Sequence, residues 1–145
     1  MKHIVFLTIC VFLFFGCKSK PNFVNEANST NKSITSFIKS YNSLTTSLIS
    51  SGNISDYREL NETKINNLEK EATLAVVQID KFDKLENKPE SMNRVFQTIR
   101  RSIMDGIYTV KYGNDLSSIP LEPFLKYMQQ YDIELRSLIN QGLSI

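Results

Sequence analysis

The sequence has few of the side chains on which most enzyme active sites depend. Its 145 residues include one histidine, His3, and two cysteines, Cys10 and Cys17. The five glycines stand singly, so there is no glycine-rich phosphate loop. Beyond residue 17 the chain therefore offers no Ser-His-Asp or Cys-His arrangement and no His or Cys metal site. We expect no enzymatic activity, no cofactor and no metal.

Neither sign of charge dominates the sequence. Seventeen basic residues stand against fifteen acidic ones, a net charge of +2 at pH 7. Such an even balance gives no electrostatic reason to expect a nucleic acid as partner.

The main apolar segment, Ile4–Phe15, is short. A transmembrane helix needs about 20 apolar residues. The segment follows the basic Lys2 and precedes Gly16 and Cys17, which is the layout of a secretory signal peptide. It resembles the signal peptides of bacterial lipoproteins, in which the cysteine is acylated and becomes the new N-terminus. The resemblance implies a signal peptide at residues 1–16, a lipid at Cys17 that holds the protein to a membrane, and a place in the bacterial cell envelope, at the outer membrane or cell surface.

Residues 17–31 are polar and rich in Asn, Ser and Thr. A segment of this kind buries too little apolar surface to offset its ordering entropy, so we expect a flexible, lipidated tether. Residues 32–145 have a length that suits one domain.

Apolar residues recur in this domain at three- and four-residue steps, which indicates four amphipathic helices. Gly52 should end the first, and the second should begin at Ser55 or Asp56 and run for roughly 30 residues, at 1.5 Å each, to a break at Pro89. Pro120 and Pro123 place the start of the fourth, and Gly142 its end. The expected core residues are Ile34, Phe37, Ile38, Tyr41, Leu44, Leu48, Ile49; Tyr57, Leu60, Ile65, Leu68, Ala72, Ala75, Ile79, Phe82; Met92, Val95, Phe96, Ile99, Ile103, Ile107, Val110; Phe124, Met128, Tyr131, Leu135, Leu138 and Ile139.

These patterns predict an all-α fold, an antiparallel four-helix bundle. A helix-swapped dimer, or a three-helix core with an outlying first helix, stays open. The segment Gly106–Gly113 is compatible with a short strand, but the helical stripe continues through it and favours helix.

Three surfaces differ from an ordinary solvated helix face. Arg94, Arg101 and Tyr108 repeat every seven residues on the outward side of the third helix, together with Tyr112. Arginine and tyrosine are enriched at binding hot spots, so these four are the candidate partner-binding residues. The other two surfaces are a serine ridge on the first helix, and Leu74 with Val77, which lie off the main stripe of the second. The ridge consists of Ser36, Ser40, Ser43, Ser47 and Ser50.

We therefore expect a membrane-anchored lipoprotein whose non-catalytic bundle binds another protein in an assembly, structural or inhibitory role. The alternative is a bundle that binds a small apolar ligand in a cavity between its helices. The residues that would line such a cavity are Phe37, Phe82, Phe96 and Phe124.

Overall fold

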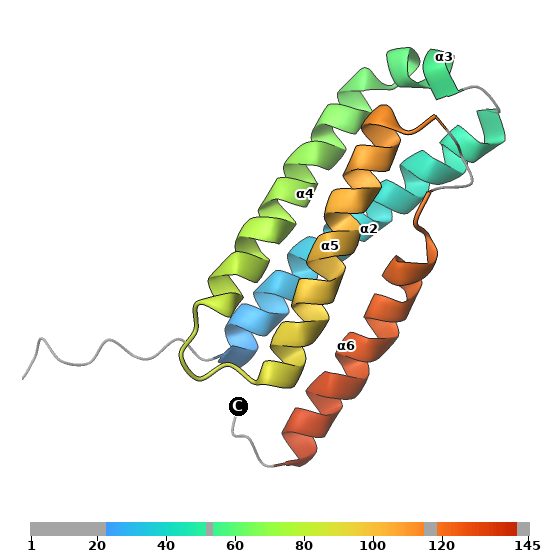
Figure 1. Ribbon diagram of the computed structural model, residues 1–145. Helices are drawn as coiled ribbons and strands as arrows, with labels where there is room; N and C mark the ends of the chain where they lie inside the picture. Colours follow the sequence, from blue (N-terminus) through green and yellow to red (C-terminus); the bar gives the residue numbers. More distant parts are fainter. Residues whose placement is uncertain (1–22, 52–53, 115–118, 142–145) are drawn as a thin grey trace, which may run out of the picture.

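The computed structural model describes residues 23–51, 54–114 and 119–141, which form five helices and no strand. They are α2 (Phe23–Ser51), α3 (Ile54–Leu60), α4 (Glu62–Asp83), α5 (Glu90–Tyr112) and α6 (Glu122–Asn140). The four long helices run alternately up and down, and each packs against the next (Figure 1). Side chains of α6 also contact α2, which closes the bundle. The prediction of an all-α antiparallel bundle is confirmed, and no described helix is long and apolar enough to cross a membrane.

The first helix begins earlier than the sequence suggested. α2 starts at Phe23, and Val24, Ala27 and Thr30 are buried in its first turns. The Thr30 hydroxyl donates to the carbonyl oxygens of Glu26 and, across the interface with α4, of Gln78. The expectation of a flexible tether is therefore wrong for residues 23–31, because Val24, Ala27 and Thr30 extend the buried face of α2 toward its start. Residues 17–22 and the signal segment lie outside the described residues.

The second predicted helix is divided in two. Asn61 separates α3 from α4, and its side-chain amide donates to the carbonyl oxygen of Tyr57 at 2.9 Å, which closes α3. The Tyr57 hydroxyl in turn donates to the carbonyl oxygen of Leu44 on α2, also at 2.9 Å. These bonds hold α3 across the end of the bundle, so one straight helix of about 30 residues does not form.

Within the mainly aliphatic core, aromatic rings form two groups. Phe37 and Tyr41 of α2 surround Phe124 of α6, with ring centroids 5.6 and 4.8 Å from it. Nearer the other end, Phe96 of α5 lies 4.9 Å from Phe82 and 5.9 Å from Tyr131. Edge-to-face and offset rings at such distances add about 0.5–1.5 kcal/mol per pair beyond burial. The rings thus join all four long helices.

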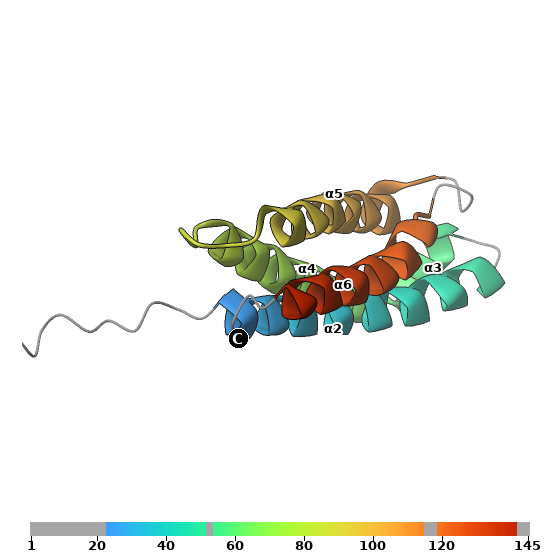
Figure 2. The same cartoon turned by 90° about the horizontal axis from the view of Figure 1, so that it is seen from below.

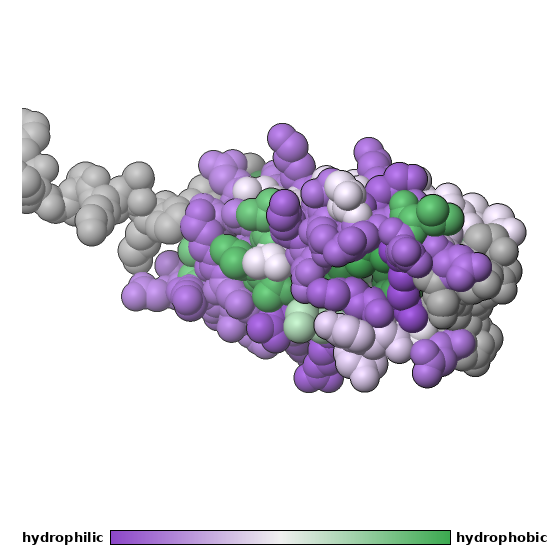
Figure 3. All heavy atoms as spheres, turned by 90° about the horizontal axis from the view of Figure 1, so that it is seen from above, coloured by the Kyte–Doolittle hydropathy of each residue, from purple (hydrophilic) through white to green (hydrophobic). Residues whose placement is uncertain are grey.

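Some predicted core residues are exposed. Ile49, Leu60, Met128 and Ile139 keep 46%, 83%, 41% and 47% of their surface accessible. Leu60 ends the short α3, and the apolar arc of α6 is wider than the surface its neighbours cover, with Tyr127 buried in place of Met128. On the face drawn in Figure 3, apolar side chains form separate patches within a mainly hydrophilic surface.

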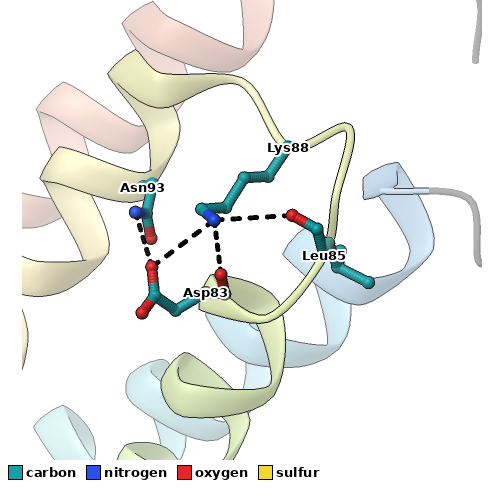
Figure 4. Close-up of polar contacts among 4 residues, drawn as sticks. All are labelled: Asp83, Leu85, Lys88 and Asn93. Atoms are coloured by element: carbon teal, nitrogen blue, oxygen red, sulfur yellow. Dashed lines mark hydrogen bonds and ion pairs between the residues drawn. The ribbon is translucent and has the colours of Figure 1, made fainter.

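The turn between α4 and α5 is held by side chains (Figure 4). Lys88 donates to the carbonyl oxygens of Asp83 and Leu85, and the Asn93 amide donates to the Asp83 carboxylate at 2.7 Å. α5 then continues from Glu90 to Tyr112, so the helical interpretation of residues 106–112 is confirmed.

Candidate functional site

The four candidate residues share the outer face of α5. Arg94, Arg101, Tyr108 and Tyr112 are all exposed, and the two tyrosines keep 65% and 60% of their surface accessible. The opposite face of the helix carries Ile103, Gly106 and Val110, which are buried. A seven-residue spacing returns to nearly the same direction at 3.6 residues per turn, which is why the sequence alone placed these side chains together.

The two tyrosines form a small cluster near the end of α5. Their ring centroids are 5.4 Å apart at an interplanar angle of 52°. The Lys111 ammonium lies 5.7 Å from the centroid of Tyr112, and both oxygens of the Glu69 carboxylate accept from it at 2.8 Å. The bond to Glu69 raises the pKa of Lys111 and joins this cation to α4, while the ammonium lies over one face of the Tyr112 ring.

The two arginines differ from their neighbour Arg100. Arg100 lies 3.1 Å from the Asp80 carboxylate of α4. Arg94 and Arg101 form no ion pair within the described part of the chain, although an exposed acid stands four positions from each, Glu90 from Arg94 and Asp105 from Arg101. Each therefore presents a guanidinium group whose planar donors are free for a carboxylate or carbonyl.

Arg58 of α3 fixes the end of α5 that carries the tyrosines. It donates to the carbonyl oxygens of Val110 at 2.8 Å, of Thr109 at 3.3 Å and of Gly113. The last carbonyls of a helix lack intrahelical partners and form its negative end, so a cation there stabilises it. Sequence analysis missed this residue, because its partners lie more than fifty positions away and nothing local marks the contact.

The phenylalanines proposed for the alternative function fill the core instead of lining a cavity. Phe37, Phe82, Phe96 and Phe124 are fully buried and contact other rings. In the described part of the chain, three of the grooves between helices are lined by other residues and by none of these four. The serine ridge and Leu74 do line two of them, between α2 and α4. Leu74 and Val77 are 60% and 52% exposed, so the bundle itself does not cover them.

Comparisons of the chain with protein-family models, curated sequences and solved structures give no match. Among the described residues, no three His, Cys, Asp or Glu side chains are grouped as metal ligands. Cys17, the expected lipidation site, lies outside the described range.

Proposed function

We propose that the protein is a lipid-anchored, non-catalytic helical bundle of the bacterial cell envelope that binds another protein through the outer face of α5. The anchor rests on Cys17 behind the apolar segment Ile4–Phe15. The proposal of a protein partner depends mainly on one observation. The exposed rings of Tyr108 and Tyr112 are in contact on the face of α5 that also carries the unpaired Arg101 and, nearer the start of the helix, Arg94. Tyrosine and arginine are enriched among the residues that contribute most to binding at interfaces.

The position of Cys17 favours one orientation of the bundle at the membrane. Cys17 precedes Phe23 by six residues, which span at most about 22 Å at 3.3–3.6 Å per residue. The start of α2 lies at the same end as the α4–α5 turn, and the tyrosine cluster lies at the opposite end (Figures 1 and 2). The 23 residues of α5 cover about 35 Å. A partner would therefore meet the tyrosines on the side that faces away from the lipid.

Photo-crosslinking tests the partner face. A crosslinking residue in place of Met104, which is 56% exposed on α5, should capture one protein from native membranes. The same residue in place of Lys70, exposed on α4, serves as the control.

Arg101→Ala and Tyr108→Ala should each weaken binding of the captured protein by more than about 1 kcal/mol. Their melting temperatures should change little, since surface substitutions stay within about 0.5 kcal/mol. Unchanged binding in both variants would refute the α5 face.

Metabolic labelling tests the anchor. The native protein should incorporate a fatty-acid probe and partition into detergent, and Cys17→Ser should abolish both. Cys10→Ser is the matched control and should leave labelling intact. Labelling that persists without Cys17 would overturn the assignment.

One groove supports the alternative of a small apolar ligand. It has a volume of about 320 Å³, lies between α5 and α6, and is lined by Val95, Ile99 and Tyr127 among others. If a fluorescent fatty acid binds there, Ser102→Phe should fill the groove and displace it. Binding unaffected by that substitution would exclude this site.

A further inference from the structure

The largest of the three grooves follows the contact between α2 and α4, away from the face proposed for the protein partner. Its volume of about 460 Å³ lies within the range of about 300–1,000 Å³ that is usual for small-ligand sites. The buried side chains of Leu44 and Leu68 contribute apolar surface to it. Tyr57 also lines it, and its hydroxyl is held by the carbonyl of Leu44.

Charged groups line this groove without being paired to one another. Lys39, Lys64 and Glu71 all face it, and none forms an ion pair within the described residues. The Oε2 atom of Glu71 is buried and accepts no hydrogen bond from the described protein atoms. A buried acceptor without a partner costs about 1–3 kcal/mol. A ligand that donates to this oxygen would remove that cost.

The two charges on α4 are separated along the groove. Lys64 and Glu71 are seven residues apart, which is about 10 Å along a helix. Three residues of extended peptide span about the same length. A tripeptide can thus place its amino terminus at Glu71 and its carboxylate at Lys64. Lys39, on the α2 side, makes the lining net positive and favours the carboxylate.

Hydroxyl groups line the α2 side of the groove. Ser40, Ser43 and Ser47 line the groove, and each hydroxyl is able to donate or accept. Ser47 donates to the carbonyl oxygen of Ser43 at 3.1 Å, which leaves its lone pairs for an N–H donor. The N–H and C=O groups of a peptide can pair with such hydroxyls. A purely apolar ligand would bury the hydroxyls without hydrogen-bond partners.

We propose that this groove binds a short peptide with a free amino terminus and a free carboxylate, the first at Glu71 and the second at Lys64. The site uses α2, α3 and α4, and its occupancy does not depend on lipidation or on the α5 face.

Calorimetric titration of the full-length processed protein in detergent tests the proposal. The probes are tri-alanine, N-acetyl-tri-alanine, which lacks the amine charge, and tri-alanine amide, which lacks the carboxylate. Tri-alanine should bind saturably and about tenfold or more tighter than either analogue, a difference of at least about 1.4 kcal/mol. This comparison needs no substitution, so it holds even if a variant folds poorly.

Substitutions then test which groove residue binds each end of the peptide. Glu71→Gln should remove the preference for the free amine, and Lys64→Gln the preference for the free carboxylate. Lys70→Gln, an exposed lysine of α4 outside the groove, should change neither. Absence of saturable tri-alanine binding, equal affinity for all three probes, or a folded variant of either groove residue that keeps its preference would overturn the proposal. None of these results bears on the α5 face, which the crosslinking experiment tests separately.

Discussion

The phenolic hydroxyl of Tyr127 on α6 donates a hydrogen bond to the Asn31 side-chain oxygen on α2, at a distance of 2.9 Å. One turn further along α6, Tyr131 makes the same kind of bond to Asn28 at 3.1 Å. Both asparagines belong to the segment whose composition suggests a tether. The last helix of the bundle is therefore fastened to residues that an analysis of apolar patterns would remove from the domain.

Removal of residues 23–31 should strongly destabilise the bundle. A fragment of residues 32–145 loses the buried Val24, Ala27 and Thr30, and the hydrogen bonds that the two tyrosine hydroxyls donate to Asn31 and Asn28. Burial of a valine side chain contributes about 1.5–3 kcal/mol and each hydrogen bond about 0.5–1.5 kcal/mol, so we expect a loss of about 3 kcal/mol or more relative to residues 23–145. Urea denaturation of both fragments measures the difference. Equal stability would mean that the first turns of α2 contribute nothing to the fold.

Arg58→Ala should destabilise the end of α5. The guanidinium group donates to three carbonyl oxygens there, and hydrogen bonds to charged groups contribute about 1.5–3 kcal/mol. Arg58 is partly exposed, so we expect a loss near the lower end, about 1–2 kcal/mol. Arg136→Ala removes an exposed arginine paired with Asp132 and should cost less than about 0.5 kcal/mol. Hydrogen exchange should show faster opening at Val110 and Gly113 in the Arg58 variant alone.

Gly106→Ala should have two opposite effects on stability, a gain in helix propensity and a loss from steric overlap in the core. Alanine is better than glycine inside a helix by about 1 kcal/mol. Its methyl group would lie 3.0 Å from Cε2 of Tyr41 and 3.3 Å from Cζ of Phe124, and both rings are fully buried. Overpacking costs about 1–3 kcal/mol, so a net loss of stability is expected. Thermal melts check it, and a gain in melting temperature would show that the rings can move.

Stability should fall in strongly alkaline solution. Burial raises the pKa of Tyr131 to about 12, and burial also raises the pKa values of Tyr127 and Tyr41. The unfolded chain has an ordinary tyrosine pKa near 10. Above about pH 10 the unfolded chain therefore loses tyrosine protons that the folded state keeps. The contribution of these tyrosines to the free energy of unfolding is complete below about pH 10 and is lost as the pH rises through 12. Urea denaturation at intervals from pH 8 to 12 should show the decline, with a shallower slope in Tyr131→Phe.

The helix pattern of the sequence was enough to predict most of the core. In α5 the six residues Met92, Val95, Phe96, Ile99, Ile103 and Val110 are all buried as expected. α6 was less predictable, because its apolar residues cover more of its circumference than the neighbouring helices bury. Met128 and Ile139 belong to that excess, and only the positions of the other helices decide which side faces inward.

The candidate sites show the same limit. The four residues Arg94, Arg101, Tyr108 and Tyr112 are exposed because of their spacing along one helix. Their exposure could therefore be predicted from the sequence. The α2–α4 groove depends on how closely two helices approach, and the contact of Arg58 with α5 joins distant segments. Neither has a local signature. The break at Asn61 was also invisible, since the apolar stripe continues across it.

The α4–α5 turn has a further consequence for the end of the bundle nearest the expected anchor. Its backbone carbonyls at Asp83 and Leu85 accept hydrogen bonds from the Lys88 ammonium. A turn that depends on solvent for its hydrogen bonds loses them when a headgroup layer or another protein displaces that solvent. At these two carbonyls the hydrogen bonds come from the protein itself. A membrane or another protein can therefore displace water from this end of the bundle without leaving those two carbonyl oxygens unpaired.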